Sequence, residues 1–506
     1  MGQLDDASEA VMRALGRFLL LTAVVAVASA HVGSPDTVFE GAAGPYSVRV
    51  VVRLPGVVPG LAEITVRTTG GPAVKTITVL PLRGGRETAA LPPADTARAV
   101  AGTSDLYTAQ LWLMQFGSYS VQVTVEGAGG RGTVLVPVMA VATRRLPFDL
   151  TLRVMLIGLG LFLTVGALTI VGAAARDSIL DPGVEPDPTR RRRARLVMAG
   201  GAGVLVVALW GGRAWWNSED ASYSRNLFHP LHAATRVLPD AAGRMLRFTI
   251  DDSAWVGRRG WTPLIPDHGK LMHLFVIRDD ASAFAHLHPV AKDSNTFEAA
   301  LPPLPAGRYR VYADIVHESG FAQTLVDTVT VAGAAASWRA SDPDDAWWVE
   351  SRQPSTISRQ QDTLADGAIM RWDSPRLMAG QDVELRFAVV ERDGRAAALE
   401  PYMGMAAHAV IATPDGSVFV HLHPLGTIAT ASQLVFQLRQ PGDTTPGVLG
   451  RRITAFEATA AHAGMAGMAP ALTFPYSFPR PGRYRMWVQA KRGGRILTGA
   501  FDLAVN

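Results

Sequence analysis

Residues 264–289 read LIPDHGKLMHLFVIRDDASAFAHLHP, and residues 399–424 read LEPYMGMAAHAVIATPDGSVFVHLHP. The two stretches align without a gap. Leucine, proline, glycine and histidine fall in register, and thirteen residues after the shared histidine each copy has the tetrapeptide His-Leu-His-Pro. Agreement of this kind indicates an internal duplication, so one folding unit occurs twice in the C-terminal half.

Each copy has the pattern of a β-hairpin. Leu274 to Ile277 and Ala409 to Ala412 predict strands, with turn residues at Asp279-Asp280 and Asp415-Gly416 and a second strand after each turn. We therefore expect two hairpins of the same length and register.

That register sets the direction of the histidines. In the second hairpin His408 is expected opposite His423, with His421 two residues further along the same face. The first hairpin permits the same arrangement about Asp280-Ala281. Same-face neighbours lie about 6.5–7 Å apart at Cα, and neutral imidazole is the commonest metal ligand among side chains. We predict that both trios bind metal: His273, His286 and His288, and His408, His421 and His423.

The alternative is that these histidines are polar residues of a half-exposed sheet, or hydrogen-bonded histidines of a core. Six of the twelve histidines lie in the two trios. A hairpin alone does not require imidazole at three repeated positions, whereas coordination does, which favours the metal hypothesis.

Neighbouring methionines favour copper, with zinc as the alternative. Three imidazoles with an open position suit either metal, and thioether sulfur favours copper(I). Met403 and Met405 precede the second hairpin, and their positions in the first copy are taken by His268 and Lys270, so the two sites are expected to differ. A Gly/Ala-rich insert that the first copy lacks adds further candidate ligands, and the secondary candidates are Met403, Met405, His268, His31, His462, Met465 and Met468.

Composition excludes several classes of site. The 506 residues include no cysteine, so disulfides, thiolate zinc sites, iron–sulfur clusters and thiol nucleophiles are ruled out. The net charge is only +4 and much of the basic excess lies in the run Arg190 to Arg195, which argues against nucleic acid as a partner.

The N-terminal region predicts export and membrane anchoring. Residues 1–30 resemble a signal peptide that ends in Ala28-Ser29-Ala30, and cleavage there would make His31 the N-terminal residue, able to chelate metal with its amine and imidazole. Apolar stretches at 152–175 and 196–214 predict transmembrane helices. The arginine-rich loop 176–195 between them is expected to be cytoplasmic, which places both flanking regions in the periplasm, at a bacterial inner membrane.

The remaining chain predicts a mainly β protein. Gly-Xaa-Tyr signatures at Tyr119, Tyr309 and Tyr484 each open an apolar strand and resemble the tyrosine corner of immunoglobulin-like sandwiches. We predict three immunoglobulin-like β-sandwich domains with two transmembrane helices between the first and second. The predicted domains are residues 31–148, residues 222–333 with the first histidine repeat, and residues 367–506 with the second repeat and its insert, with a linker at 334–366.

Residues 31–148, with His31 and the segment from Arg53 to Gly60, resemble the YtkA-like and CopC-like periplasmic domains. This resemblance implies an immunoglobulin-like sandwich associated with copper handling. The duplicated His-Leu-His-Pro region is similar to exported bacterial proteins linked to heavy-metal resistance.

These observations predict a non-enzymatic, membrane-anchored protein that binds copper for buffering, delivery or resistance. Its expected partners are the metal ion, the lipid bilayer and a metal efflux or uptake membrane protein. Two alternatives stay open: a copper or zinc oxidase or hydrolase, which would need a cleft and an acid–base group beside the metal, and a scaffold of stacked sandwiches.

Overall fold

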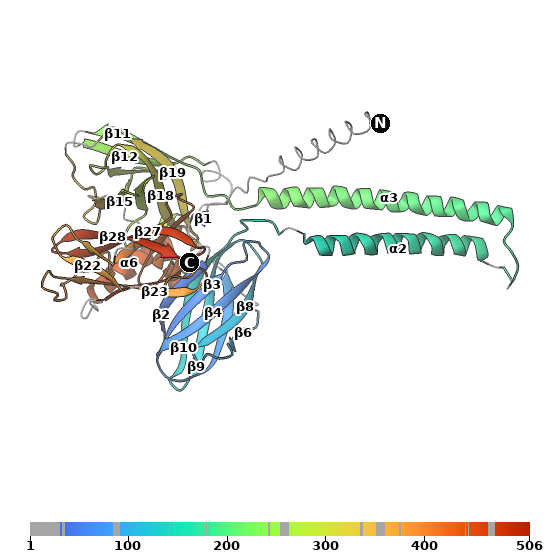
Figure 1. The fold of residues 1–506 in the computed structure, drawn as a ribbon, viewed down its shortest axis with the longest axis horizontal. Coiled ribbons are helices and arrows are strands. Elements are labelled where there is room, and N and C mark those ends of the chain that lie inside the picture. The colour runs from blue at the N-terminus through green and yellow to red at the C-terminus, as the bar shows by residue number, and fades with distance from the viewer. Residues whose placement is uncertain are drawn as a thin grey trace, which may run out of the picture.

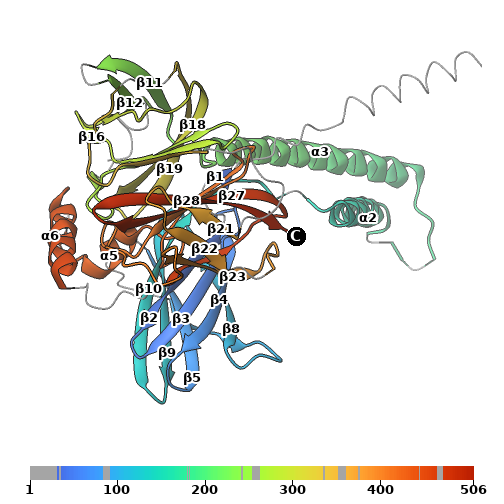
Figure 2. The ribbon, with the colours of Figure 1, turned by 60° about the vertical axis from the view of Figure 1, so that its left-hand side comes forward.

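The computed structural model describes residues 31–32, 36–83, 92–146, 148–178, 180–181, 183–240, 243–252, 263–333, 337–350, 360–373, 376–440, 442–443, 445–463 and 471–506. These residues are mainly β, in six sheets that pair into three sandwich-like units, with two long helices between the first and second units. The C-terminal unit lies between the other two, and the helix pair extends away from all three (Figures 1 and 2). The predicted signal peptide lies outside the described residues.

The N-terminal unit packs the five-stranded sheet β2-β3-β4-β8-β7 on the four-stranded sheet β10-β9-β5-β6. Valine and isoleucine alternate with polar residues along its strands, so one face of each sheet is apolar and the two faces form a single core. Its strands are β2 (Asp36–Ala43), β3 (Tyr46–Arg53), β4 (Gly60–Gly70), β5 (Val74–Arg83), β6 (Asp95–Thr96), β7 (Arg98–Ala99), β8 (Leu106–Leu113), β9 (Gly117–Gly127) and β10 (Gly130–Ala140).

The middle unit contains the first histidine repeat. The sheet β11-β12-β17-β16 packs on the sheet β13-β18-β14-β15-β20, whose strand β18 also pairs with β19. Its strands are β11 (Ala233–Asp240), β12 (Gly243–Ile250), β13 (Leu264–Ile265), β14 (His273–Arg278), β15 (Ala283–Leu287), β16 (Val290–Ala291), β17 (Thr296–Ala300), β18 (Gly307–His317), β19 (Ala322–Val331) and β20 (Ala346–Val349).

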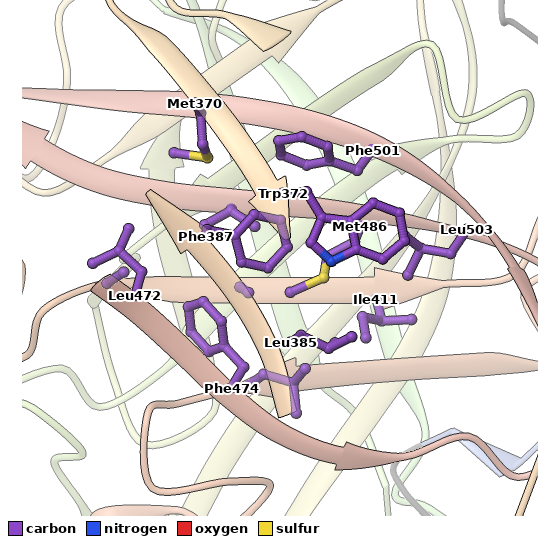
Figure 3. Close-up of a cluster of buried hydrophobic side chains, with 14 of the residues drawn as sticks. Met370, Trp372, Leu385, Phe387, Ile411, Leu472, Phe474, Met486, Phe501 and Leu503 are labelled. Atoms are coloured by element: carbon purple, nitrogen blue, oxygen red, sulfur yellow. The ribbon is translucent and has the colours of Figure 1, made fainter. Parts of the chain in front are cut away.

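The C-terminal unit contains the second repeat. Its core between two sheets is rich in aromatic residues, among them Trp372, Phe387 and Phe501 (Figure 3). Two helices, α5 (Thr430–Leu438) and α6 (Val448–Ala463), follow the second hairpin as the insert. The sheets run β1-β25-β24-β27-β28 and β21-β22-β23-β26, with β1 (His31–Val32), β21 (Gln361–Thr363), β22 (Ile369–Asp373), β23 (Asp382–Val390), β24 (His408–Ala412), β25 (Val418–Leu422), β26 (Ala471–Ser477), β27 (Gly482–Arg492) and β28 (Arg495–Val505).

The two long helices, α2 (Leu150–Asp177) and α3 (Pro188–Arg225), are long and apolar enough to cross a membrane. They pack against each other, and at Gly172 the contact is so close that a Cβ would meet the side chain of Met198. The start of α2 and the end of α3 are joined by the ion pair of Arg145 with Asp220, at 3.2 Å. Both β regions therefore lie at the same end of the helix pair.

The element boundaries in the structure differ from the predicted bounds in three places. The loop predicted at 176–195 is shorter because Asp187 caps α3 and Pro188 occupies its first turn, so the arginine run is helical. Helix α3 also continues past the predicted end at 214, to Arg225, through a segment that is more polar than the apolar part of the helix. The predicted linker 334–366 contains β20, which adds to the edge of the middle unit.

Strand β1 also differs from the prediction, since it belongs to another unit. Its backbone pairs in parallel with β25 of the C-terminal unit, His31 opposite Val418, instead of joining the N-terminal sandwich. An extended segment can add to an unpaired sheet edge, which β25 offers on this side.

The three signature tyrosines form the hydrogen bonds expected of tyrosine corners. The hydroxyls of Tyr309 and Tyr484 donate to the backbone carbonyl four residues upstream, each at 2.7 Å. The Tyr119 hydroxyl accepts from the backbone N–H four residues upstream at 3.2 Å. The shared signature therefore has one structural role in all three units.

Candidate metal centre

The two hairpins have the predicted register. Leu274 pairs with Leu287 in the first and Ala409 with Leu422 in the second, which puts the first histidine of each trio opposite the last. In both, the middle histidine points to the same face, as residue alternation requires. The prediction that each trio points to one side is confirmed.

That face is covered by the other repeat. Phe275 and Phe284 of the first hairpin's sheet pack in one apolar cluster with Phe419 and Trp487 of the second unit. The rings of Phe284 and Trp487 stack at 4.9 Å. The strands of both hairpins are consequently buried on both faces, and the histidines lie in the interface between the two repeats.

The imidazoles meet in two groups, and each group takes members from both repeats. Group A consists of His273, His286 and His421, and group B of His268, His408 and His423; within each, one ring nitrogen per residue lies within 4.8 Å of the others. The groups adjoin, since the ring centroids of His421 and His423 are 4.4 Å apart.

Group A contains two ring nitrogens that face each other without a proton to share. The Nε2 of His273 donates to the backbone carbonyl of Asp267 at 3.0 Å, and the Nδ1 of His286 donates to Oε1 of Gln489 at 2.8 Å. Each inner nitrogen is therefore a lone pair, and Nδ1 of His273 lies 3.1 Å from Nε2 of His286. A cation between these lone pairs would turn a repulsion into coordination.

The third member of group A is oriented by the opposite repeat. Nδ1 of His421 lies 3.3 Å from the carboxylate of Asp314, and its Nε2 has no partner among the described residues. A carboxylate on the outer nitrogen is the usual way in which a metal-binding histidine is fixed.

Group B contains the most poorly satisfied imidazoles. His408 is buried and neither of its ring nitrogens has a partner in the described part of the chain. His423 donates Nδ1–H to the carbonyl of Ile428 at 2.9 Å. Among the described residues, Nε2 of His423 and Nε2 of His268 have no partner. A buried polar atom without a partner costs about 1–3 kcal/mol, and a ligand at these nitrogens would remove that cost.

Burial keeps the imidazoles neutral, the form that binds metal. Loss of solvation, reinforced by neighbouring imidazoles, holds the pKa well below its usual range for His268, His273, His286, His408 and His421. Loss of solvation also lowers the pKa of His423. These imidazoles are therefore not readily protonated, and their unpaired nitrogens keep the lone pair that a metal ligand needs.

His288 departs from its predicted trio. Its ring is 4.5 Å from that of His286, but its Nδ1 lies 3.2 Å from Asp345, and Asp342 completes a His-Asp-Asp set. Both aspartates come from the segment predicted to be a linker. The unpaired Nε2 of His288 leaves it available as an additional ligand at the edge of group A.

A two-residue turn presents His268 to the second repeat. Asp267 and Lys270 close the turn with two backbone hydrogen bonds of 2.9 and 3.0 Å, and His268 has a φ of 53°. A positive φ is costly for a residue other than glycine and is concentrated at functional sites. The ring of His268 lies 5.5 Å from that of His408.

The two insert helices hold this turn. The backbone N–H of Ala431, in the first turn of α5, donates to the Asp267 carboxylate at 2.7 Å. Glu457 of α6 accepts from the backbone N–H of His268 at 3.2 Å. The insert of the second repeat therefore positions the histidine that the first repeat contributes to group B.

A cavity of about 430 Å³ reaches both groups. His421 and His423 line it together with Asp314, and the N-terminal unit contributes Thr143. Phe228, three residues after the end of α3, also lines it. The two histidine groups thus adjoin a space lined by residues of all three β units.

The secondary candidates divide into three sets. His268 joins group B. Met403 and Met405 are half-buried in the turn of the second repeat, where Met403 has a φ of 50°. Of His31 and His462 the structure describes only the backbone, in β1 and α6, and Met465 and Met468 lie outside the described residues.

The sequence reasoning missed the residues that orient the imidazoles. Asp314 is the residue paired with His273 on β18, and Gln489 is the residue paired with His408 on β27. These two polar residues occupy equivalent places in otherwise apolar strands. That repetition is the signal by which the sequence could have identified them.

A family model described as a domain of unknown function, DUF8832, matches residues 235–333 and 362–506. It covers both histidine repeats and their hairpins. No curated protein matches the chain.

Similarity to solved structures is weak. A Ca²⁺-stabilised adhesin with which an Antarctic bacterium binds ice has 6% identity over 89% of this chain and 70% of that chain, with a TM-score of 0.16. Invasin, a bacterial integrin-binding protein, has 10% identity over 90% and 60%, with a TM-score of 0.14. Chicken CNTN1 FN1–FN3 has 8% identity over 94% and 99%, with a TM-score of 0.12. This chain spans 60% of the invasin chain.

Proposed function

We propose that the chain is a membrane-anchored protein that binds a transition metal at the interface of its two histidine repeats. Copper is the first candidate for that metal. Its role would be to buffer or deliver the metal, or to confer resistance to it. The observation that carries this proposal is the convergence of buried imidazoles, of which His273, His286, His421 and His423 each have an acceptor at the ring nitrogen that points away from the group.

Hydrogen-bonded core histidines would have a different pattern. A core histidine satisfies both ring nitrogens, whereas His408 satisfies neither and His423 only one in the described residues. Five imidazoles with unpaired buried nitrogens in one place would together cost several kcal/mol, and bound metal removes that cost.

Imidazole nitrogens suit copper and zinc alike, and the methionine at the turn of the second repeat favours copper(I). We propose further that each β unit is immunoglobulin-like. The arginine run at the far end of the helix pair would face the cytoplasm, and the metal centre the periplasm.

Metal analysis of the purified full chain tests the proposal. Copper should co-purify or bind after addition, and His408→Ala with His286→Ala should abolish tight binding. His232→Ala is the matched control because that histidine is exposed and paired with Asp251, away from the centre. Binding that survives the double substitution, or no binding of copper or zinc by the wild type, would refute the proposal.

The cavity supports a metalloenzyme as the second candidate. It places Asp314, whose pKa is raised by burial, beside His421 and next to space for a small substrate. Oxidation of small phenols by the copper-loaded chain, or ester hydrolysis by the zinc-loaded chain, should then be lost in Asp314→Asn with metal retained. Absence of turnover in the loaded wild type leaves metal binding as the function.

A further inference from the structure

We propose that the centre holds two metal ions and that each ion is ligated by both repeats: one by group A and the other by group B. This inference rests on the proposed metal binding and assigns its ligands. It divides the second hairpin, since His421 and His423 would serve different ions, and it separates His268 from His273 and His286 of the first repeat.

The number of imidazoles requires more than one ion. Groups A and B contain six, whereas copper or zinc in proteins takes about four ligands. The nitrogens also fall into two sets, each with separations within 4.8 Å. Three imidazoles per ion leave an open position, and the cavity that reaches His421 and His423 lies beside both sets.

The residues that orient the imidazoles also act across the interface between the two repeats. Asp314 stands opposite His273 in the first repeat but contacts His421 of the second. Gln489 stands opposite His408 in the second repeat but contacts His286 of the first. Equivalent positions thus make the same crossed contact in both directions, which is the relation expected of a pseudo-two-fold interface.

The proposed ligand sets also link two of the β units. Because neither repeat alone supplies three imidazoles to one group, each ion would bridge the middle and C-terminal units. Apolar packing of Phe275, Phe284, Phe419 and Trp487 aligns the two hairpins, and the ions would fix them.

Pairwise substitutions distinguish crossed from uncrossed sites. With the wild type binding two copper ions per chain, His286→Ala with His421→Ala removes two ligands of one group, so one ion should be lost and one retained. His421→Ala with His423→Ala removes one ligand from each group, so both ions should be lost although both changes lie in one hairpin. Uncrossed sites predict the reverse pattern.

Two further measurements keep the test independent of folding. The same pairs as glutamine variants, with near-ultraviolet circular dichroism matching the wild type, would show that loss of metal is not loss of structure. In the copper(II)-loaded wild type, electron paramagnetic resonance should show magnetic coupling between ions, and His286→Gln should leave an uncoupled signal. One ion in the wild type, or the uncrossed pattern, would overturn this inference while leaving metal binding intact; no binding at all would overturn both.

Discussion

The first repeat carries His268 at its turn and the second carries Met403 at the equivalent place, with φ values of 53° and 50°. The turns are alike in backbone, closed by the same pair of hydrogen bonds, at Asp267 with Lys270 and at Tyr402 with Met405. Their surroundings differ, because among the described residues the two insert helices hold the His268 turn and not the Met403 turn. The two repeats thus share the backbone of the turn but differ in the side chain it carries and in the elements that hold it.

Removal of metal should cause the largest change, a loss of stability of the two paired repeats. A ligand present at about a thousand times its Kd stabilises the folded state by about 4 kcal/mol per site. The copper-loaded chain should therefore melt at a clearly higher temperature than the metal-free chain, measured by calorimetry. The His286→Ala, His408→Ala double variant is the control, and a copper-induced shift of equal size in that variant would contradict the account.

A smaller difference in stability is expected between alanine variants of two histidines at equivalent positions. Nε2 of His273 donates to the Asp267 carbonyl, whereas neither ring nitrogen of His408 has a partner among the described residues, so in metal-free protein His273→Ala should cost about 1 kcal/mol more than His408→Ala. Chemical denaturation of the two metal-free variants measures the difference. Equal destabilisation would mean that the contacts of His273 contribute nothing.

The insert offers a way to weaken one site alone. Glu457→Ala removes the acceptor for the His268 backbone and should lower metal affinity at group B by about tenfold, while group A is unchanged. Glu457→Gln, which keeps an acceptor oxygen, is the matched control. Titration with a competing chelator gives both affinities, and equal weakening of the two sites would show that the insert does not act through His268.

The smallest effect is expected at the other turn. By the symmetry of the repeats, Met403 should serve the ion of group A, as His268 serves that of group B. Met403→Leu should reduce affinity for copper(I) several-fold with zinc affinity unchanged, because only the thioether is lost. Competition titrations with each metal measure this, and parallel changes for both metals would place Met403 in packing alone.

Much of the centre could be predicted from the sequence. Hairpin register follows from residue alternation and turn position, and it correctly placed His408 opposite His423 and His273 opposite His288. The tyrosine signatures likewise predicted one hydrogen bond in each β unit.

The crossing of the sites could not be predicted. A hairpin pattern says which residues share a face but not what covers that face. Phe275 and Ile277, on the same face of β14 as His273, gave a partial signal, because a strand apolar on both faces is covered on both. Asp342 and Asp345 were missed because the polar segment around them resembles a linker, and their role depends on long-range contact with His288.

Anomalous diffraction at the copper absorption edge, from crystals of the copper-loaded chain, tests the central claim most directly. The account predicts two peaks in the interface, one about 2.0–2.1 Å from nitrogens of His273, His286 and His421, and the other at that distance from His268, His408 and His423. A single peak, or peaks bound only by histidines of one hairpin, would contradict it.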